Sequence, residues 1–401
     1  MIEKLVELLN SHEPGERLEA LTALARASAQ GLIERPSRRE YVNNHIHTTY
    51  SFSPYSPSKA AYLAWASGLA VAGIMDHDSV GGTEEFIEAG QIIGVPVTVG
   101  FECRCSFTST PFEGRRLNNP DQESVAYMVM HAIPRRMLGE AERFLAPFRE
   151  KRNIRNRKMV NNLNQLLAPY GLSLDFERDI LPLSLHAFGG SVTERHILYA
   201  LASAFTDNEL HRQFLLGQFK SQLIGSIYVD ATDELTHISE FIALGEKLGA
   251  IPAYAYLGDV GVSTTGDKKP QAFEDSFLEE LMAYLKQAGI RAVTYMPARN
   301  TADQLRRVMS LCEEYGFLQI SGEDINSSTQ EFFCKKTEAR EFRHLIDSAW
   351  ALIGNEAAAS QDLGMAMFSP KSQAEFPSLG SRIKHFADLG KSSIGKQARG
   401  G

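Results

Sequence analysis

Two histidines separated by one residue, His45 and His47, are the first side chains in this sequence whose spacing suggests chemistry. Alternate residues of a β-strand project from the same face, so one strand can present both imidazoles to one metal ion. Further ligand-type residues stand at the ends of later strand-like segments: Asp76, His77 and Asp78 in "IMDHD", Glu102 in "TVGFE", and Glu323, Asp324 and Asn326 in "ISGEDIN". Imidazole and carboxylate ligands suit Zn, Mn or Fe. The pattern predicts a metal site where these strand ends meet.

The elements that must position these residues alternate between strand and helix patterns. Strand-like segments at 41–47, 71–78, 95–105 and 124–133 surround helix-like segments at 56–69 and 81–94, and the alternation returns over 250–326. Repeated β-then-α units predict an α/β fold with a parallel sheet or barrel. In such a barrel the carboxyl ends of the strands face the active site, which is where the histidines and acids fall.

The helical stretches divide the chain further. We expect a helical N-terminal extension over 1–38, a barrel over 39–137 and 246–330, a helical insertion or cap over 138–245, and a helical C-terminal extension over 331–401. The last segment, "GKSSIGKQARGG", is rich in glycine, serine and charge, and we expect it to be disordered.

Composition limits the classes of partner. The 401 residues carry a net charge of -8, which argues against general nucleic-acid or anionic-membrane binding. No apolar run approaches the roughly 18 residues of a membrane span, and the N-terminus does not resemble a secretory signal. The four cysteines form no C-x-x-C pair, and buried thiols are favoured over a metal role for Cys103 and Cys105. We expect a cytoplasmic protein with reduced thiols.

The order H-x-H, D-H-D, G-x-E and a final strand ending in an acid resembles the PHP family, named for polymerase and histidinol phosphatase. The resemblance covers roughly residues 41–326, and "KRNIRNRKMVNNL" and "VTERHILYAL" are similar to the helical insertion of its nucleoside bisphosphatase branch. It implies a distorted (β/α)7 TIM-like barrel. It also implies two or three divalent metals and the hydrolysis of phosphate monoesters.

The resemblance implies ligands residue by residue. A first metal site would be formed by His45, His47, Glu102 and Asp324, all of which are present. Four other expected ligands are replaced: Phe52 stands where the family has aspartate, and Tyr127, Tyr256 and Asn326 stand where it has histidine. We therefore expect one divalent ion per chain, Mn, Zn or Fe, in place of two or three.

The remaining polar residues have predicted roles with open alternatives. Arg152 and Arg155 share a helix face and could bind a substrate phosphate, or belong to a solvated basic face. His77 and His196 are candidate proton donors, although His77 could merely bond Asp76. The replaced positions Tyr127, Tyr256 and Asn326 would face the substrate, or the tyrosines would fill space left by lost ions.

The expected activity follows from the resemblance. It is metal-dependent hydrolysis of a small, nucleotide-like phosphate monoester at a reduced site, with His45, His47, Glu102 and Asp324 as ligands. The alternative is a binding or regulatory protein that kept the pocket and lost turnover.

Overall fold

Seven strands form a nearly closed barrel-shaped sheet in the order β1-β2-β3-β4-β6-β7-β8, and a short β5 pairs with β3. The computed structural model describes residues 1–37, 40–261 and 271–397. The strands are β1 Tyr41–Ile46, β2 Leu69–His77, β3 Val97–Ser106, β4 Val125–His131, β5 Thr236–His237, β6 Ile251–Ala255, β7 Ala292–Tyr295 and β8 Leu318–Ser321. The α/β barrel predicted from the sequence is thereby confirmed.

One strand departs from the parallel arrangement that the alternating pattern predicts. β4 runs antiparallel to both β3 and β6. The segment between β3 and β4 contains no helix, and the chain therefore returns beside β3 as a hairpin rather than by a crossover. Expecting parallel strands throughout was wrong at this position.

The barrel closes between its first and last strands. Ile46, the last residue of β1, forms an isolated parallel bridge with Ile325, which follows β8. The side chain of Asn43 accepts from the backbone N–H groups of His45 and Glu323, and its amide donates to the carbonyl of Glu323. The amide of Asn44 donates to the carbonyl of Ser321 (3.1 Å), so both asparagines of β1 add side-chain hydrogen bonds between the two edges.

Helices surround this barrel. They are α1 Ile2–Leu8, α2 Pro14–Ala29, α3 Pro57–Ala66, α4 Thr83–Ile93, α5 Leu138–Leu167, α6 Glu194–Ser203, α7 Glu209–Ile227, α8 Ile238–Leu248, α9 Leu278–Ala288, α10 Ala302–Tyr315, α11 His344–Gln361, α12 Pro370–Glu375 and α13 Leu379–Gln397. Their starts follow local signals. Ser56, for example, caps α3 by accepting from the N–H of Lys59, and Pro57 occupies the first turn.

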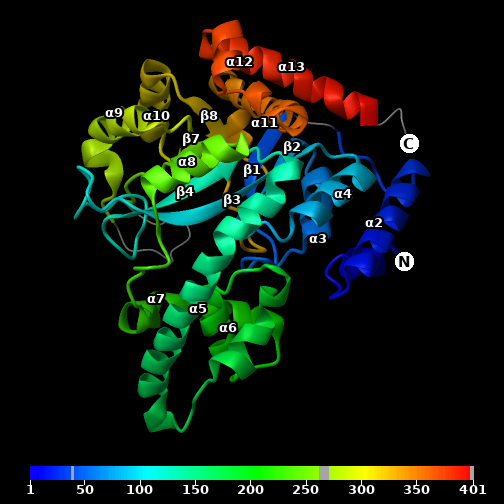
Figure 1. Ribbon diagram of the computed structural model, residues 1–401. Coiled ribbons are helices and arrows are strands. Elements are labelled where there is room, and N and C mark those ends of the chain that lie inside the picture. Colours follow the sequence, from blue (N-terminus) through cyan, green and yellow to red (C-terminus); the bar gives the residue numbers. More distant parts are fainter. Residues whose placement is uncertain (38–39, 262–270, 398–401) are drawn as a thin grey trace.

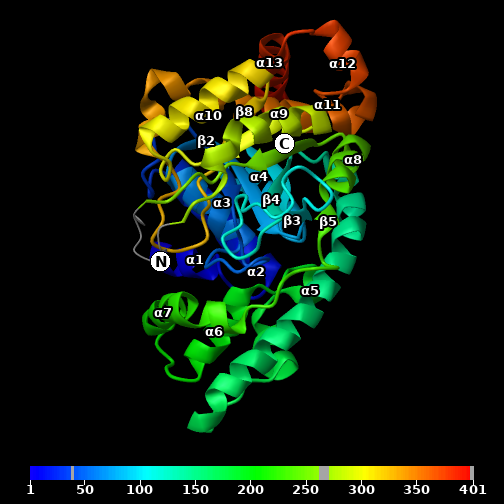
Figure 2. The same ribbon diagram turned by 90° about the vertical axis from the view of Figure 1, so that its left-hand side faces the viewer.

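The two ends of the barrel are covered differently. In both ribbon views α5, α6 and α7 project from one end of the sheet, and α11, α12 and α13 lie over the opposite end (Figures 1 and 2). α8, although expected in the insertion, packs against β3 and β6. α13 runs through Gln397, into the segment 390–401 for which disorder is expected, and residues 398–401 lie outside the described part of the chain.

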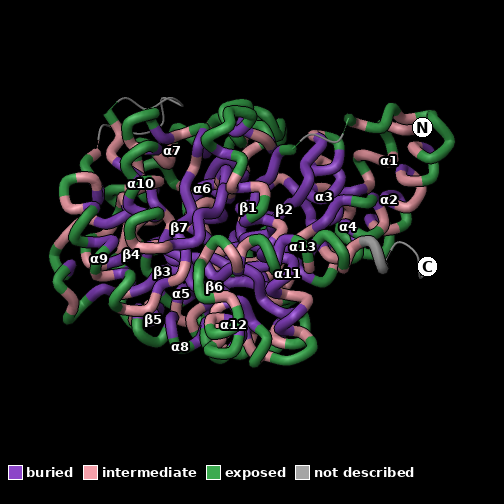
Figure 3. The backbone as a smooth tube through the Cα atoms, turned by 90° about the horizontal axis from the view of Figure 1, so that it is seen from above, coloured by how far each residue is buried: buried purple, intermediate pink, exposed green. Residues whose placement is uncertain are grey.

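Buried residues concentrate in the strands, which form the purple centre of Figure 3. The barrel interior joins β-strand residues such as Val129, Ala253 and Ile320 to Leu352 of α11 in one apolar cluster. α11 therefore closes one end of the barrel with apolar contacts, and the polar strand ends are left for the other. In the described residues no helix is both long enough and apolar enough to cross a membrane.

Candidate metal centre

Closure of the barrel brings Asp324 to the histidines. The N–H of His47 donates to the carbonyl of Ile325 (2.9 Å), and the N–H of Ile325 donates to the carbonyl of His45 (3.1 Å). Asp324 Oδ1 consequently lies 3.1 Å from His47 Nε2. Gly322 permits this approach, because a Cβ at that position would lie 2.9 Å from the Cβ of His45.

The register between β2 and β3 supplies the second carboxylate. His77 and Glu102 are paired residues of these strands, and His77 Nδ1 lies 2.9 Å from Glu102 Oε2. The same oxygen is 3.7 Å from His45 Nε2 and 4.0 Å from His47 Nε2. The two Nε2 atoms are 3.2 Å apart. All four predicted ligands and His77 thus converge at one end of the barrel.

The spacing of these atoms fits a divalent ion. Two ligand atoms bound tetrahedrally at about 2.1 Å from zinc are about 3.4 Å apart. The donors form two overlapping groups that share His47: His45, His47 and Asp324, and His47, His77 and Glu102. His45, His47 and Glu102 are buried, whereas the Asp324 side chain is 42% exposed and opens the group to solvent.

A hydrogen-bond relay orients His47. The Ser51 hydroxyl donates to Asp76 (2.6 Å) and lies 3.2 Å from His47 Nδ1. Since the hydroxyl proton is directed at Asp76, the Ser51 oxygen is left to accept from Nδ1–H of His47. That tautomer leaves the Nε2 lone pair free for a metal, as in carboxylate-supported histidine ligands. Asp76 also accepts from the N–H and hydroxyl of Thr48, so it is a supporting residue.

The surroundings favour the protonation states that can bind a metal in three of these side chains. These states are the ionised carboxylates of Glu102 and Asp324 and the neutral imidazole of His47. Burial opposes ionisation of Glu102, but His77 and His45 outweigh it and hold its pKa well below the usual range. Burial opposes ionisation of Asp324 too, and its contact with His47 lowers its pKa. Burial and His77 together lower the pKa of His47. The pKa of His45 is raised, because Glu102 outweighs the opposing effect of burial.

His196, predicted to donate a proton, is placed at the start of α6. Its Nδ1 accepts from the N–H of Thr193 (2.9 Å), and the two residues form a reciprocal cap. Burial lowers the pKa of His196 to about 3. The ring is therefore neutral at pH 7, which does not suit a proton donor. His77, the other candidate, contacts Glu102 and lies 4.5 Å from the His47 ring, so it stands within the donor cluster itself.

Arg152 and Arg155 are buried and already paired, which excludes the solvated basic face. Arg152 Nη2 lies 2.7 Å from Asp78 Oδ2. Arg155 Nε lies 2.9 Å from both oxygens of Glu234, and its Nη2 lies 2.6 Å from Glu194. Whether they bind a phosphate remains a prediction.

The two tyrosines at replaced ligand positions lie in different surroundings. The Tyr127 ring lies 5.8 Å from the ring of His77, at the edge of the donor cluster. The Tyr256 hydroxyl instead donates to Asp275 (2.6 Å), so this side chain points away from the cluster. The barrel-facing residue there is Ala255, which packs with the interior and supplies no donor. The expectation that Tyr256 faces the substrate was therefore wrong.

Neither Asn326 nor Phe52 belongs to the two groups of candidate metal donors. The Asn326 amide donates to Asp324 Oδ1 (2.7 Å), so it positions that carboxylate. Phe52 adopts a positive φ of 71° and packs edge-on against His196 with ring centroids 4.8 Å apart. The residue that replaces an expected acid therefore belongs to the core of the insertion.

Sequence reasoning missed two charged residues beside the centre. Arg104 stands two residues after Glu102 on β3 and is buried, and the strand period of two could have identified it. Glu234 pairs with Arg104, Arg152 and Arg155. It lies in a connector with no repeating pattern, and no sequence signal marks it.

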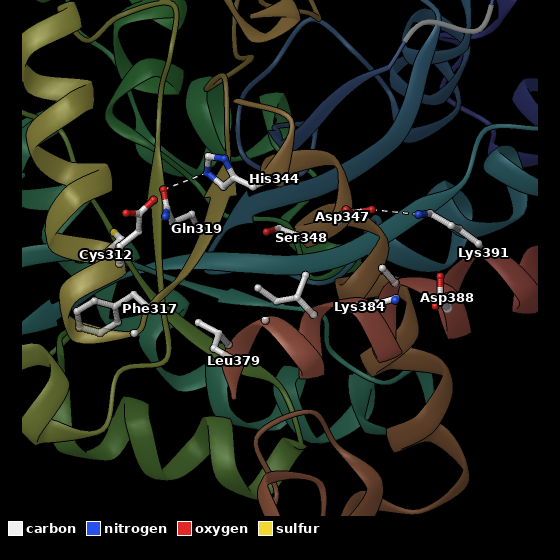
Figure 4. Close-up of a pocket in the computed structure, with 15 residues that line it drawn as sticks. Cys312, Phe317, Gln319, His344, Asp347, Ser348, Leu379, Lys384, Asp388 and Lys391 are labelled. Atoms are coloured by element: carbon white, nitrogen blue, oxygen red, sulfur yellow. Dashed lines mark hydrogen bonds and ion pairs between the residues drawn. The ribbon is translucent and has the colours of Figure 1, made fainter. Parts of the chain in front are cut away.

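A separate cavity of about 600 Å³ lies at the other end of β8, between α10, α11 and α13. Figure 4 shows His344 and Gln319 on one side of it and Leu379 and Lys384 of α13 on another. The cavity lies near the start of β8, at Phe317 and Gln319, whereas Asp324 follows the end of that strand. None of the candidate ligands lines the cavity.

Comparisons with known proteins agree with the fold. No family model matches the chain. A 5'-3' exoribonuclease of Haemophilus influenzae is 32% identical over 74 residues, which are 18% of this chain, and the match spans a quarter of that relative's length. A provisionally assigned metal-dependent phosphoesterase from Bifidobacterium adolescentis superposes with a TM-score of 0.53 at 19% identity, covering 77% of this chain and 96% of that one.

An amidohydrolase from Chromobacterium violaceum, solved with bound sulfate and no metal, gives a TM-score of 0.54 at 17% identity, covering 73% of this chain and 89% of that one. At these identities the two likenesses show a shared barrel fold. They leave the substrate of this chain open.

Proposed function

We propose that this chain is a metal-dependent hydrolase of the PHP type, acting on a phosphate ester. The observation that supports the proposal is the convergence of imidazole and carboxylate groups at one end of the barrel, in two overlapping groups of three that share His47. Mn, Zn and Fe all suit this donor set. When bound, the ion would lower the pKa of a coordinated water toward about 7 and polarise a phosphoryl oxygen.

The chain's own residues supply the rest of the site. The relay from Asp76 through Ser51 holds the His47 ring, and Asn326 holds Asp324. His77 is the side chain best placed to carry a proton at the mouth, because it is partly exposed and bonded to Glu102. The insertion projects from this end of the barrel (Figure 1).

The proposed substrate is a small, nucleotide-like phosphate monoester, and we propose one ion per chain. The buried arginines near the centre support an anionic substrate. The net charge of -8 does not favour long nucleic acids. Short oligoribonucleotides nonetheless belong in the substrate panel, since a curated relative is named as an exoribonuclease.

The test is phosphate release from a panel of nucleotides, sugar phosphates and short 5'-phosphorylated RNAs, with Mn, Zn or Fe supplied. We expect release that stops on chelation and in the Glu102→Gln variant. The control is Glu280→Gln, which removes an exposed carboxylate of a surface ion pair. Release that survives both chelation and Glu102→Gln would contradict the proposal.

A binding or regulatory role is the second candidate. It is favoured by Ala255 and Phe52, which stand at the barrel mouth and in the insertion core without metal-binding groups. This role predicts that nucleotides raise the midpoint of thermal unfolding with no turnover under any metal. The same panel, followed by thermal unfolding and by phosphate release, separates the two candidates.

A further inference from the structure

Three arginines from two layers of the structure converge on one carboxylate. Arg104 lies on β3 of the barrel, and Arg152 and Arg155 lie on α5 of the insertion. Glu234 pairs with Arg104, accepts from Arg155 Nε at 2.9 Å through both oxygens, and lies 3.8 Å from Arg152 Nε. All four side chains are buried, so these contacts are shielded from water.

The charges in this cluster balance, but the hydrogen bonds do not. Asp78 and Glu194 complete the set, giving three guanidinium groups and three carboxylates. Each guanidinium has five N–H donors, and Nε of Arg104 is buried with no hydrogen-bond partner. A donor left unpaired in the interior is costly. A network built only for stability would gain from a hydrogen bond to Arg104 Nε. The unpaired donor therefore indicates a place for an acceptor that none of the three carboxylates supplies.

The cluster adjoins the candidate metal centre. Arg104 is two residues beyond Glu102 and therefore projects from the same face of β3. Asp78, which Arg152 holds at 2.7 Å, directly follows His77. Tyr127 is paired with Arg104 across the strands and lies 5.8 Å from the His77 ring. A substrate held at the donor cluster would extend along β3 into these arginines.

Glu234 is carried by a segment that can withdraw it. Residues 228–235 contain no helix or strand, between the end of α7 and β5. The backbone of this connector is anchored at Ala231, whose N–H and carbonyl bond the side chain of Gln122, and at Val229, whose carbonyl accepts from Arg155 Nη1 (3.1 Å). Moving the Glu234 carboxylate therefore breaks no helical or ladder hydrogen bond.

We propose that Glu234 occupies, in the unliganded chain, the place that an anionic group of the ligand takes on binding. Arg104 is then a binding residue beside the metal centre, and Glu234 is an internal competitor that must leave first. A tetrahedral dianion offers four oxygens in place of two, which provides an acceptor for Arg104 Nε. The proposal rests on the proposed function for the phosphate ester as ligand, but the binding site itself can be tested without turnover.

The test is calorimetric titration of the metal-free protein with inorganic sulfate, a dianion that cannot be hydrolysed. In Glu234→Gln the competing charge is lost and the three arginines carry an excess positive charge. We expect sulfate to bind about tenfold or more tightly than to the natural chain. Glu177→Gln, which removes an exposed partner of Arg157 in the same insertion, should bind sulfate like the natural chain.

Equal or weaker sulfate binding by Glu234→Gln, or no binding by either protein, would overturn the proposal. If Glu234→Gln does not fold, hydrogen exchange of the natural chain decides. Sulfate should then speed exchange in residues 228–235, and unchanged or slower exchange would overturn the proposal. Failure of the hydrolysis assay leaves this result unaffected, because neither measurement uses metal or turnover.

Discussion

Replacing Asp324 by asparagine isolates one carboxylate of the proposed metal centre. The side chain keeps its size, and in the unliganded chain an amide can still bond His47, whose Nε2 lies 3.1 Å from Oδ1. Because the Asp324 side chain is 42% exposed, water screens part of its attraction to the buried His47. Folding of the metal-free chain should therefore change little.

The effect on metal binding should be large. A divalent ion and a carboxylate about 2.1 Å apart attract by about 4 kcal/mol even at a dielectric constant near 80. Water taking the vacated position restores part of this energy. We expect the dissociation constant for Zn²⁺ or Mn²⁺ to rise at least about 100-fold, or about 2.7 kcal/mol.

The assay is competition for the ion against a fluorescent chelator, with thermal unfolding of the metal-free proteins alongside. Asp303→Asn is the matched control, because the Asp303 carboxylate on α10 is 90% exposed and belongs to neither group of candidate donors. Metal affinity and stoichiometry unchanged in Asp324→Asn would refute the reasoning that places Asp324 on the ion.

Three further predictions concern stability. Burial raises the pKa of Glu356 on α11 from 4.5 to about 8. Its contribution to stability is therefore present below pH 4.5 and is lost as pH rises through about 8. Above pH 8 the Glu356→Gln variant should unfold at a higher temperature than the natural chain, and it should lose this advantage at pH 4.5. Gly354→Ala should lower the free energy of unfolding in urea by about 3 kcal/mol, because its Cβ would lie 1.9 Å from the Phe386 carbonyl, whereas Gly380→Ala in open space should raise it by up to about 1 kcal/mol. Arg17→Met leaves Glu85 buried without its guanidinium partner and should cost about 3 kcal/mol in the same assay, while the exposed Arg306→Met should stay within about 0.5 kcal/mol.

The barrel was predictable because its strands and helices have distinct periods. β1 to β3 fall within a few residues of the predicted segments. β4 also lies where it was predicted, but its direction was wrong, because an apolar strand pattern says nothing about direction. α7 was missed: only Leu216 and Ile227 are buried along its 19 residues, so it shows little of the amphipathic pattern that marks a helix.

Strand alternation predicts that one strand presents both His45 and His47, whereas the choice of Glu102 and Asp324 as their partners came from the resemblance to the PHP family. Glu102 of β3 and Asp324, which follows β8, lie beside these histidines at one end of the barrel, although β1 and β2 stand between β3 and β8 in the sheet. The proximity of His77 to Glu102 depends on the register of β2 against β3, which local pattern does not determine. Tyr256 was assigned to the wrong face because a shift of one residue along β6 exchanges inside for outside.

The central claim is that His45, His47, Glu102 and Asp324 hold one catalytic ion. The most direct test is anomalous diffraction from crystals soaked in Zn²⁺ or Mn²⁺, recorded at the absorption edge of the metal. We predict one peak within about 2.3 Å of donor atoms of all four side chains. No peak at this end of the barrel, or one whose ligands exclude His45 and His47, would contradict the account.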